Sequence, residues 1–508
     1  MATFIDQHTH EIRGTLACFD RVVITGTLPD ICHAQAMAGY LSSQGTRLFD
    51  YPRWAEPLRD ELRAHAEQLA QEQGRSIEFI PRTDAFRKEK RIKALLAERG
   101  DQPGLVHIFS AMEACPSFKP WHDKLLGRTF LKPTPGKCLH YYFYFIDPDL
   151  GLCDLRVPTW APFRLQFYFN GHNWLARRLA RTGISYTQLD NAFVEIADGG
   201  RAQQLADEFD VRRLHRRLDR FARQYCPVLP HFQAGYHWSL MQVEYAMDVV
   251  FAAPAAFQPL YEALTHTAIH AIKPAHVATF LGRKLSGYQG EIGNHFETRI
   301  EGTKIKHHMG PVSIKLYDKF GFVCPVECTA NDVTFFKHHR RVEHRDGTSE
   351  FTLAAVRKSI YSLSALRGLM GAATHRYLEF MAAVEDPQPG LRALDKISQP
   401  VREGDRSYRG FNLFHGEDLD LLRAIVRGEF TISGFQSRHL RPHVPAVSAA
   451  QLSRALKRLR IHGLIKKIGH RYKYYLTALG RTVSAAALKL RELVIIPALN
   501  QPSLAARA

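Results

Sequence analysis

The sequence predicts an α+β protein with several domains, in which antiparallel sheets are combined with helical segments. Three observations support this fold class. The chain has 508 residues, more than one ordinary hydrophobic core accommodates. Its hydrophobic content of 45%, with 11% aromatic residues, is typical of a globular protein. Runs that alternate as strands do are interleaved with runs whose apolar residues recur every three or four positions, as in helices.

The first predicted domain, an α+β domain, covers residues 1–195. "CFDRVVITGTLP" (18–29) predicts a strand that ends in a proline turn. Helical spacing follows in 54–74 and again in 84–100, where the predicted helix is strongly basic. Within residues 138–171, three aromatic and β-branched runs are separated by Pro, Asp and Gly, which predicts an antiparallel three-stranded meander.

Two further segments and a linker are predicted in the middle of the chain. Residues 196–285 show helical spacing, and we expect "HWSLMQVEYAMDVVF" (237–251) to be one of their helices. Residues 286–398 predict a β-hairpin followed by a helical segment. Proline, glycine and charged residues at 385–390 and 399–410 predict the linker to a last domain.

The charge of the chain predicts a nucleic-acid partner. The net charge is +18, and residues 411–493 hold 15 Lys and Arg against 5 Asp and Glu, so they contribute 15 − 5 = +10 of it. Basic helices are also predicted in the body at 86–93, 177–181 and 212–223. Proteins this basic usually meet a polyanion, and we expect duplex DNA, with RNA as the alternative. A merely solvating, arginine-rich surface remains a second interpretation.

The cysteines and the first residues favour a reduced, cytoplasmic protein. The eight cysteines are scattered without CxxC spacing, which indicates buried thiols rather than a disulfide framework or a zinc site. The opening "MATFIDQHTHEIRG" lacks the basic and apolar regions of an export signal. No apolar run is long enough to span a bilayer, so no membrane partner is expected.

The last 98 residues contain a closely ordered set of helix and hairpin signals, placed in a predicted domain at 411–495. Residues 417–426 predict an amphipathic helix and 434–444 a short second one. A third helix begins at Ser448, because Ser-Ala-Ala-Gln is a capping box in which Gln451 reaches back to the cap. Its apolar stripe consists of Leu452, Ala455, Leu456 and Leu459.

A basic hairpin follows this third helix. Gly463 ends the helix, and "LIKKI" and "RYKYYLT" predict two short strands around Gly469 and His470. Thr477 is placed to cap a final helix. Three helices followed by such a hairpin and a last helix form a winged helix-turn-helix.

"LSRALKRLRIHGLIKKI" followed by "YYLTALGR" resembles the winged-helix DNA-binding domains of MarR-type transcriptional regulators. The resemblance implies that the third helix enters the major groove while the wing contacts the flanking backbone. Winged helices also mediate protein contacts, which is the alternative. MarR regulators are far shorter, so their whole-protein function does not carry over. The residues implied to bind DNA are Gln451, Arg454, Lys457, Arg458, Arg460, Lys466, Lys467, His470, Arg471 and Lys473.

"SIKLYDKFGFVCPVECTAND" (313–332) predicts a hairpin in the body. A two-residue turn at Phe320 and Gly321 would place Asp318 and Glu327 on one apolar face, whereas a bulge would turn Glu327 to the other. Buried carboxylates need a partner or a metal; an ordinary hairpin with an exposed tip is the alternative. The string also resembles the "YDK … E" strands of rolling-circle replication initiators. The His-apolar-His motif of their relatives is absent from the sequence, and no motif marks the nucleophilic tyrosine that they use.

Glu244 and Asp248 would lie one turn apart on the helix predicted at 237–251. Together with Asp318 and Glu327 they form the predicted catalytic and metal-binding set, for Mg²⁺ or Mn²⁺. Salt bridges to the basic helix at 212–220 are the alternative. The histidines at 307, 308, 338, 339 and 344 are expected to add to a basic surface, with metal ligation as the other possibility. No GxxxxGK[ST] motif appears, so ATP is not an expected cofactor.

These features predict a nucleic-acid-binding protein that processes DNA for a mobile element or replicon, as a metal-dependent nuclease, a transposase-like enzyme or a replication initiator. A transcriptional regulator with a large ligand-sensing body is the first alternative. A non-catalytic RNA- or DNA-binding protein is the second.

Overall fold

The computed structural model contains two compact units, Met1–Glu385 and Asp386–Ala508. It describes residues 3–491 except 82–85, 126, 287, 300–301, 386–391, 393–394, 413–414, 428–429, 431–433, 446 and 469–471, and it also describes Ile496. The segments expected at 1–195, 196–285 and 286–398 therefore lie in one unit up to Glu385, and residues 386–398 fall in the second unit. The structure is α+β, as expected, with one large, almost entirely antiparallel sheet.

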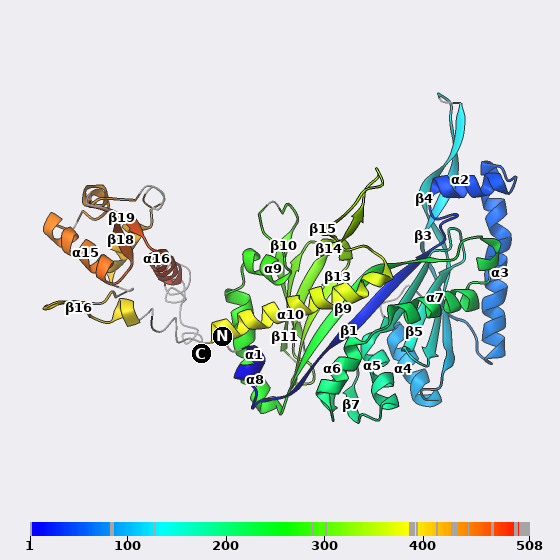
Figure 1. The fold of residues 1–508 in the computed structure, drawn as a ribbon, viewed down its shortest axis with the longest axis horizontal. Helices are drawn as coiled ribbons and strands as arrows, with labels where there is room; N and C mark the ends of the chain where they lie inside the picture. Colours follow the sequence, from blue (N-terminus) through cyan, green and yellow to red (C-terminus); the bar gives the residue numbers. More distant parts are fainter. Residues whose placement is uncertain are drawn as a thin grey trace, which may run out of the picture. The chain divides into compact units, whose positions relative to one another are not determined.

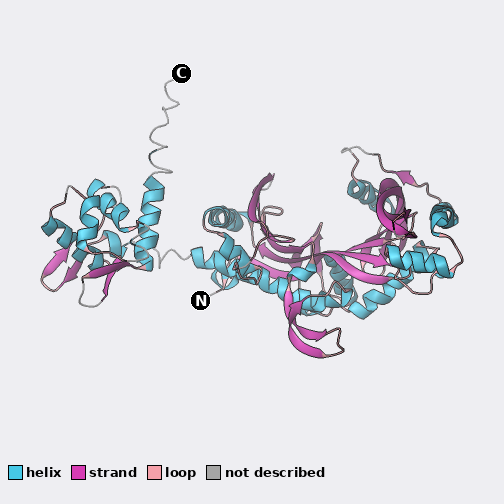
Figure 2. Cartoon of the chain, turned by 90° about the horizontal axis from the view of Figure 1, so that it is seen from above, coloured by secondary structure: helices cyan, strands magenta, loops and turns pink. Residues whose placement is uncertain are grey.

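The body is built on this eleven-stranded sheet, which is curved along its length (Figures 1 and 2). Only the short pairing of β2 with β3 is parallel. In spatial order the strands are β10 (Ile292–Arg299), β11 (Gly302–Met309), β12 (Val312–Leu316), β13 (Val323–Ala330), β9 (His237–Phe251), β1 (Ile12–Thr27), β6 (Leu165–Asn170), β5 (Gly151–Pro158), β4 (Arg128–Asp147), β3 (Gly104–Asp123) and β2 (Glu78–Phe79). The predicted meander corresponds to β4, β5 and β6 and is confirmed.

Helices lie against the sheet, and two small ribbons complete the body. The helices are α1 (Phe4–Gln7), α2 (Ala34–Ser43), α3 (Tyr51–Glu72), α4 (Lys88–Arg99), α5 (Gly171–Arg181), α6 (Gly199–Asp207), α7 (Val211–Tyr225), α8 (Pro254–His270), α9 (Pro274–Phe280) and α10 (Leu363–Glu385). The ribbons are β7 (Tyr186–Leu189) with β8 (Ala192–Ile196), and β14 (Lys337–Glu343) with β15 (Ser349–Ala355). Figure 1 shows α10 crossing β9 and β13, which it contacts. In the described part of the chain, no helix is both long and apolar enough to cross a membrane.

The helix predicted at 237–251 is wrong, because these residues form strand β9 in the middle of the sheet. A strand that is paired on both sides and covered on both faces carries apolar residues on both faces, so it lacks the alternation that marks a half-buried strand. The β-branched Val243, Val249 and Val250 favour the strand. Acids four residues apart share a face in either structure, so the spacing of Glu244 and Asp248 did not separate the two interpretations.

The predicted register of the β12–β13 hairpin is also wrong, by one residue. Lys319 pairs with Val323 and Lys315 with Glu327, so the loop has three residues, 320–322, rather than two. Phe320 and Gly321 both adopt positive φ, at 62° and 80°. A one-residue slip turns every side chain of one strand to the other face. Glu327 therefore shares its face with Lys315.

The second unit begins with a short ribbon, β16 (Val401–Glu403) with β17 (Arg406–Tyr408), where residues 399–410 were predicted to be linker. Residues 386–390 of the other predicted linker segment lie outside the described residues. The elements expected near the end of the chain follow: α12 (Gly416–Ile425), α14 (Ser437–Leu440), α15 (Ala449–Ile461), β18 (Ile465–Ile468), β19 (Lys473–Leu476) and α16 (Ala478–Leu490). Short 3-10 turns occur in the chain at Leu48–Asp50, Leu229–His231, Val333–Phe335, Ile360–Ser362 and Arg441–His443. The capping box of Ser448 and Gln451 and the Thr477 cap are confirmed. Leu452, Leu456 and Leu459 are buried in the core of this unit.

Candidate metal centre

A bulge in strand β1 positions the side chain of Asp20 at the site. The pairing of β1 with β9 shifts between Phe19 and Val22, which leaves Asp20 and Arg21 in a bulge. Bulges redirect side chains and are frequent beside functional sites. The Asp20 carboxylate, 7% exposed, accepts hydrogen bonds from the amides of Asn170 at 2.8 Å and Asn191 at 3.1 Å.

Glu244 and Glu327 reach the same place from the two neighbouring strands. Glu244 pairs with Thr329 and Glu327 with Ala246, so both acids lie on one face of the sheet. Tyr245, next to Glu244, points to the opposite face, where it lies against Gly371 of α10. The two acids therefore lie on the face of β9 and β13 that α10 does not cover. Both are buried, at 6% and 2% exposed.

Lys315 and Tyr317 bring a charge and a hydroxyl to these acids. The Lys315 ammonium contacts both the Glu244 and the Glu327 carboxylate, and its side chain is 22% exposed, so the cluster reaches solvent there. Tyr317 donates a hydrogen bond to Glu327 at 2.7 Å, and Thr329 donates one to Glu244 at 2.8 Å. These donors hold the carboxylates in fixed positions.

The environment raises the pKa values of Glu327, Lys315 and Tyr317, each for a different balance of causes. Burial raises the pKa of Glu327 to about 7, although Lys315 opposes the rise. Burial disfavours the Lys315 ammonium, but the two glutamates outweigh it and raise the pKa of Lys315 to about 12. Burial and the Glu327 charge raise the pKa of Tyr317, so the phenol keeps its proton. Groups with such shifts gather at functional sites.

His172 bridges Asp20 to Asp248. Its Nδ1 lies 3.3 Å from Asp20 and its Nε2 lies 3.2 Å from Asp248. Burial disfavours the imidazolium, but the surrounding thiol and carboxylates raise the pKa of His172 well above its usual value. Burial also opposes ionisation of Asp20, yet the His172 contact lowers the pKa of that carboxyl. The two carboxylates thus favour the protonated form of His172, although its Nδ1 is too poorly aligned with Asp20 for a hydrogen bond.

The start of α5 fixes His172 in this position. Asn170 caps the helix by accepting hydrogen bonds from the backbone of His172 and Asn173. Gly171 lies against the Phe19 carbonyl of β1, and a Cβ at this position would be 1.9 Å from that oxygen. Glycine therefore allows the helix to approach the strand closely enough for the His172 contacts.

The cluster carries a net negative charge that a bound cation would neutralise. Four carboxylates (Asp20, Glu244, Asp248 and Glu327) face two cations, His172 and Lys315, so full ionisation leaves 4 − 2 = 2 negative charges buried. One oxygen each of Asp20, Glu244 and Glu327 lie within 4.8 Å of one another. Oxygens on opposite sides of a Ca²⁺ ion are roughly 5 Å apart, and those of Mg²⁺ roughly 4 Å. These three residues, the acid triad, thus have the spacing of a divalent-cation site.

The structure brings together two of the four predicted metal ligands, Glu244 and Glu327. Asp248 is instead engaged by His172, and Asp318 accepts hydrogen bonds from Gln258 at 2.7 Å and from the Gly321 backbone at 2.9 Å, which stabilises the β12–β13 turn.

Asp20 and His172 were not among the site residues predicted from the sequence. A charged residue inside the apolar run "CFDRVVITG" is the same signal that identified Glu244, so it could have marked Asp20. His172 carried no such signal, because its role depends on the packing of α5 against β1.

The five histidines are divided between the core and the surface. His307 is buried and contacts Asn294 at 2.7 Å and the Tyr377 hydroxyl at 3.3 Å; burial lowers its pKa to about 4. This neutral histidine does not contribute charge to a basic surface. The other four have at least partly exposed side chains, at positions 308, 338, 339 and 344. Those at 338 and 339 lie on β14 beside Arg340 and Arg341.

The predicted DNA-binding residues of the second unit differ in exposure. Arg454 and Lys466 are exposed and Gln451 is an exposed cap residue, whereas Lys457 and Arg460 form ion pairs with Glu403. Lys467 and Lys473 are partly exposed, and the ammonium of each lies over a tyrosine ring. His470 and Arg471 lie outside the described residues.

Arg458, one of the residues implied to bind DNA, does not face solvent. Its side chain is 11% exposed, bonds to the buried Asp418 and lies 3.9 Å from the centre of the Phe411 ring. Arg458 therefore links α15 to α12 within the unit.

Comparison of the chain with known protein families and with curated protein sequences found no match in either set.

Proposed function

We propose that the body of this protein binds nucleic acid and carries out phosphodiester chemistry with a divalent cation held by Asp20, Glu244 and Glu327. The observation that supports it is the buried acid triad, whose charge Lys315 and His172 compensate only in part. Mg²⁺ or Mn²⁺ is the proposed ion, because hard cations prefer carboxylate oxygens.

The neighbours of the triad fit this chemistry. A cation at the triad would polarise a phosphate oxygen or generate a hydroxide nucleophile. It would also replace the Lys315 ammonium as the partner of the two glutamates. The Lys315 side chain is partly exposed to solvent, so its ammonium group could then neutralise a phosphate oxygen of the substrate. The protonated Tyr317 hydroxyl would orient Glu327.

The outer half of the β3–β4 hairpin supports nucleic acid as the substrate. Figure 1 shows this hairpin extending beyond the other strands. Lys119 pairs directly with Lys132 and Trp121 with Phe130, so one face carries two lysines followed by two aromatic rings. Trp121 is 43% exposed and Phe130 is 36% exposed. Like charges directly opposite each other destabilise a ribbon, and a polyanion would offset that cost while the rings stack on bases.

The second unit would supply duplex binding as a winged helix. In this proposal α15 enters the major groove and the β18–β19 hairpin contacts the backbone, with exposed Arg454 and Lys466 as the main contacts. The role as a DNA-processing protein of a mobile element or replicon remains the preferred biological setting, because it combines duplex recognition with strand chemistry.

A cleavage assay tests the proposal. Full-length protein is incubated with end-labelled single-stranded and duplex DNA, in Mg²⁺, in Mn²⁺ or in EDTA. We expect metal-dependent cleavage by the wild type, loss of cleavage in Asp20→Asn and Glu244→Gln, and unchanged DNA binding. Glu262→Gln on α8 is the control, since Glu262 is an exposed glutamate outside the cluster. Wild-type protein that binds DNA but cleaves neither form with either ion would support a non-catalytic binding protein instead.

A further inference from the structure

Helix α7 carries a stripe of arginines with an unusual charge arrangement. Arg213, Arg216, Arg217 and Arg220 are spaced by three or four residues and so lie along one side of the helix. The opposite side is buried through Leu214, Leu218, Phe221 and Tyr225. Like charges at these spacings destabilise a helix unless anions neutralise them.

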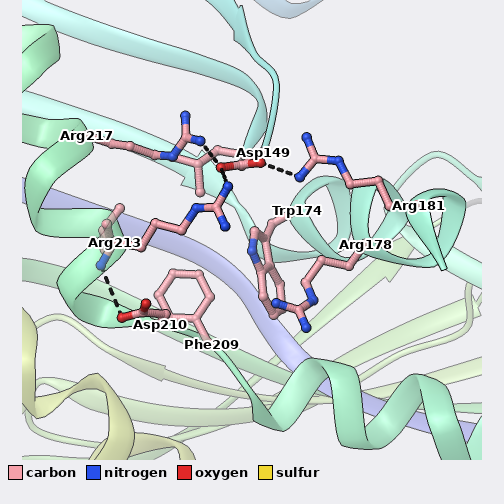
Figure 3. Close-up of a pocket in the computed structure, with 10 residues that line it drawn as sticks. Asp149, Trp174, Arg178, Arg181, Phe209, Asp210, Arg213 and Arg217 are labelled. Atoms are coloured by element: carbon pink, nitrogen blue, oxygen red, sulfur yellow. Dashed lines mark hydrogen bonds and ion pairs between the residues drawn. The ribbon is translucent and has the colours of Figure 1, made fainter.

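Two buried aspartates neutralise part of this stripe and fix its geometry. Asp147, 2% exposed, bonds to Arg217 and Arg220, and Asp149, 7% exposed, bonds to Arg213 and Arg217. Asp149 also bonds to Arg181 of α5, as Figure 3 shows. The Asp147 carboxylate accepts two backbone hydrogen bonds, at 2.9 and 3.0 Å, within the turn between β4 and β5. The guanidinium groups are therefore held in place before any ligand binds.

Positive charge remains in excess after these pairings. Five arginines, the four of the stripe and Arg181, face two aspartates, which leaves 5 − 2 = 3 positive charges. Arg216 forms no ion pair with any described residue. The Nε of Arg217 is buried and lacks a hydrogen-bond acceptor among the described groups. The arginine cluster thus has more hydrogen-bond donors and positive charge than its acceptors neutralise, and a bound anion would supply the missing acceptors.

A cavity lies where the excess charge is greatest. An open cavity of about 230 Å³ is lined by Arg213, Arg216, Arg217 and Arg220. A neighbouring opening is lined in part by Trp174, Phe209 and Arg178 (Figure 3). Guanidinium groups match the oxygens of phosphate in pairs, and several fixed donors favour phosphate over a singly charged carboxylate.

We propose that this cavity is a phosphate-binding site, separate from the acid triad, that takes the phosphates of a nucleic-acid strand. The stripe from Arg213 to Arg220 is about 10 Å long at the rise of a helix. A strand of duplex DNA carries a phosphate roughly every 3.4 Å along the axis, so the stripe is long enough for more than one. The site does not depend on catalysis and stands even if the triad proves inactive.

The test compares two charge reversals on one helix. Arg216→Glu alters the cavity, whereas Arg212→Glu makes the same change in net charge at an exposed arginine that does not line it. Binding of full-length protein to a fluorescent single-stranded oligonucleotide and to inorganic pyrophosphate is measured in EDTA over a range of salt concentrations. Equal melting temperatures for the two variants verify that folding is intact.

We expect Arg216→Glu to weaken oligonucleotide binding at least tenfold more than Arg212→Glu. The slope of log affinity against log salt should also fall, by about 0.7 for each lost phosphate contact. If pyrophosphate binding falls in parallel, the site also takes free phosphates. If only oligonucleotide binding falls, the strand backbone is the ligand. Equal effects of the two reversals, or no binding of either ligand by the wild type, would overturn the proposal.

Discussion

Replacing Glu327 with glutamine tests the electrostatics of the acid triad without removing the side chain. The amide has the shape of the protonated acid but cannot ionise. Since burial raises the pKa of Glu327 to about 7 from the usual 4.5, the folded protein holds this proton more tightly than the unfolded chain. The stability that depends on it is fully present below about pH 4.5 and is lost as the pH rises through 7.

The expected size of the effect follows from this shift. At pH 8 in EDTA, ionised Glu327 costs the wild type about 3 kcal/mol, a cost that Glu327→Gln avoids. The variant should therefore melt several degrees above the wild type at pH 8 and close to it at pH 5. Adding Mn²⁺ at pH 8 should raise the melting temperature of the wild type, because the cation neutralises the ionised carboxylates, and should raise that of the variant far less.

Tryptophan fluorescence is a suitable probe for these melts. All five tryptophans, at 54, 121, 160, 174 and 238, lie in the first unit, so the signal reports on the unit that contains the triad. If Glu327→Gln melts below the wild type at pH 8 in EDTA, then ionised Glu327 stabilises the fold through Lys315, and the reasoning is refuted.

Two further predictions concern the proposed nucleic-acid surfaces. Arg458→Ala should destabilise the second unit by about 3 kcal/mol in chemical unfolding followed by circular dichroism, because the buried Asp418 loses a charged partner and, among the described residues, keeps only Arg409 and the Asn412 backbone. Arg454→Ala should leave stability unchanged and reduce the salt dependence of duplex binding; equal stability of the two variants would contradict this. Trp121→Ala should weaken binding of a single-stranded oligonucleotide roughly tenfold in a fluorescence titration. The control Phe49→Ala, which removes an exposed aromatic ring elsewhere, should leave binding unchanged. Equal losses in the two variants would mean that Trp121 does not stack on bases.

Much of the local structure could be predicted from the sequence, because its signals are local. The capping box at Ser448, the cap at Thr477 and the apolar stripe of α15 each depend on residues within one or two helical turns. The β4–β6 meander is marked by the turn residues between its strands.

The features that failed depend on contacts distant in the sequence. Strand β9 was predicted as a helix because strands on both sides bury it, and neither neighbour can be recognised from the run itself. Arg458 was expected to face solvent, but its partner Asp418 lies 40 residues away on α12. The acid triad joins Asp20 to residues more than two hundred positions later, and a bulge in β1 places it there.

The most direct measurement of the central claim is the location of a cation in a crystal. Crystals of the full-length protein grown with MnCl₂ would be measured for anomalous scattering by manganese. We predict one strong anomalous peak between the carboxylates of Asp20, Glu244 and Glu327, with the Lys315 ammonium moved away from the two glutamates, and no peak there in Asp20→Asn. Absence of a peak at saturating Mn²⁺, with Lys315 still bonded to both glutamates, would contradict the account and leave the cluster as a buried ion-pair network.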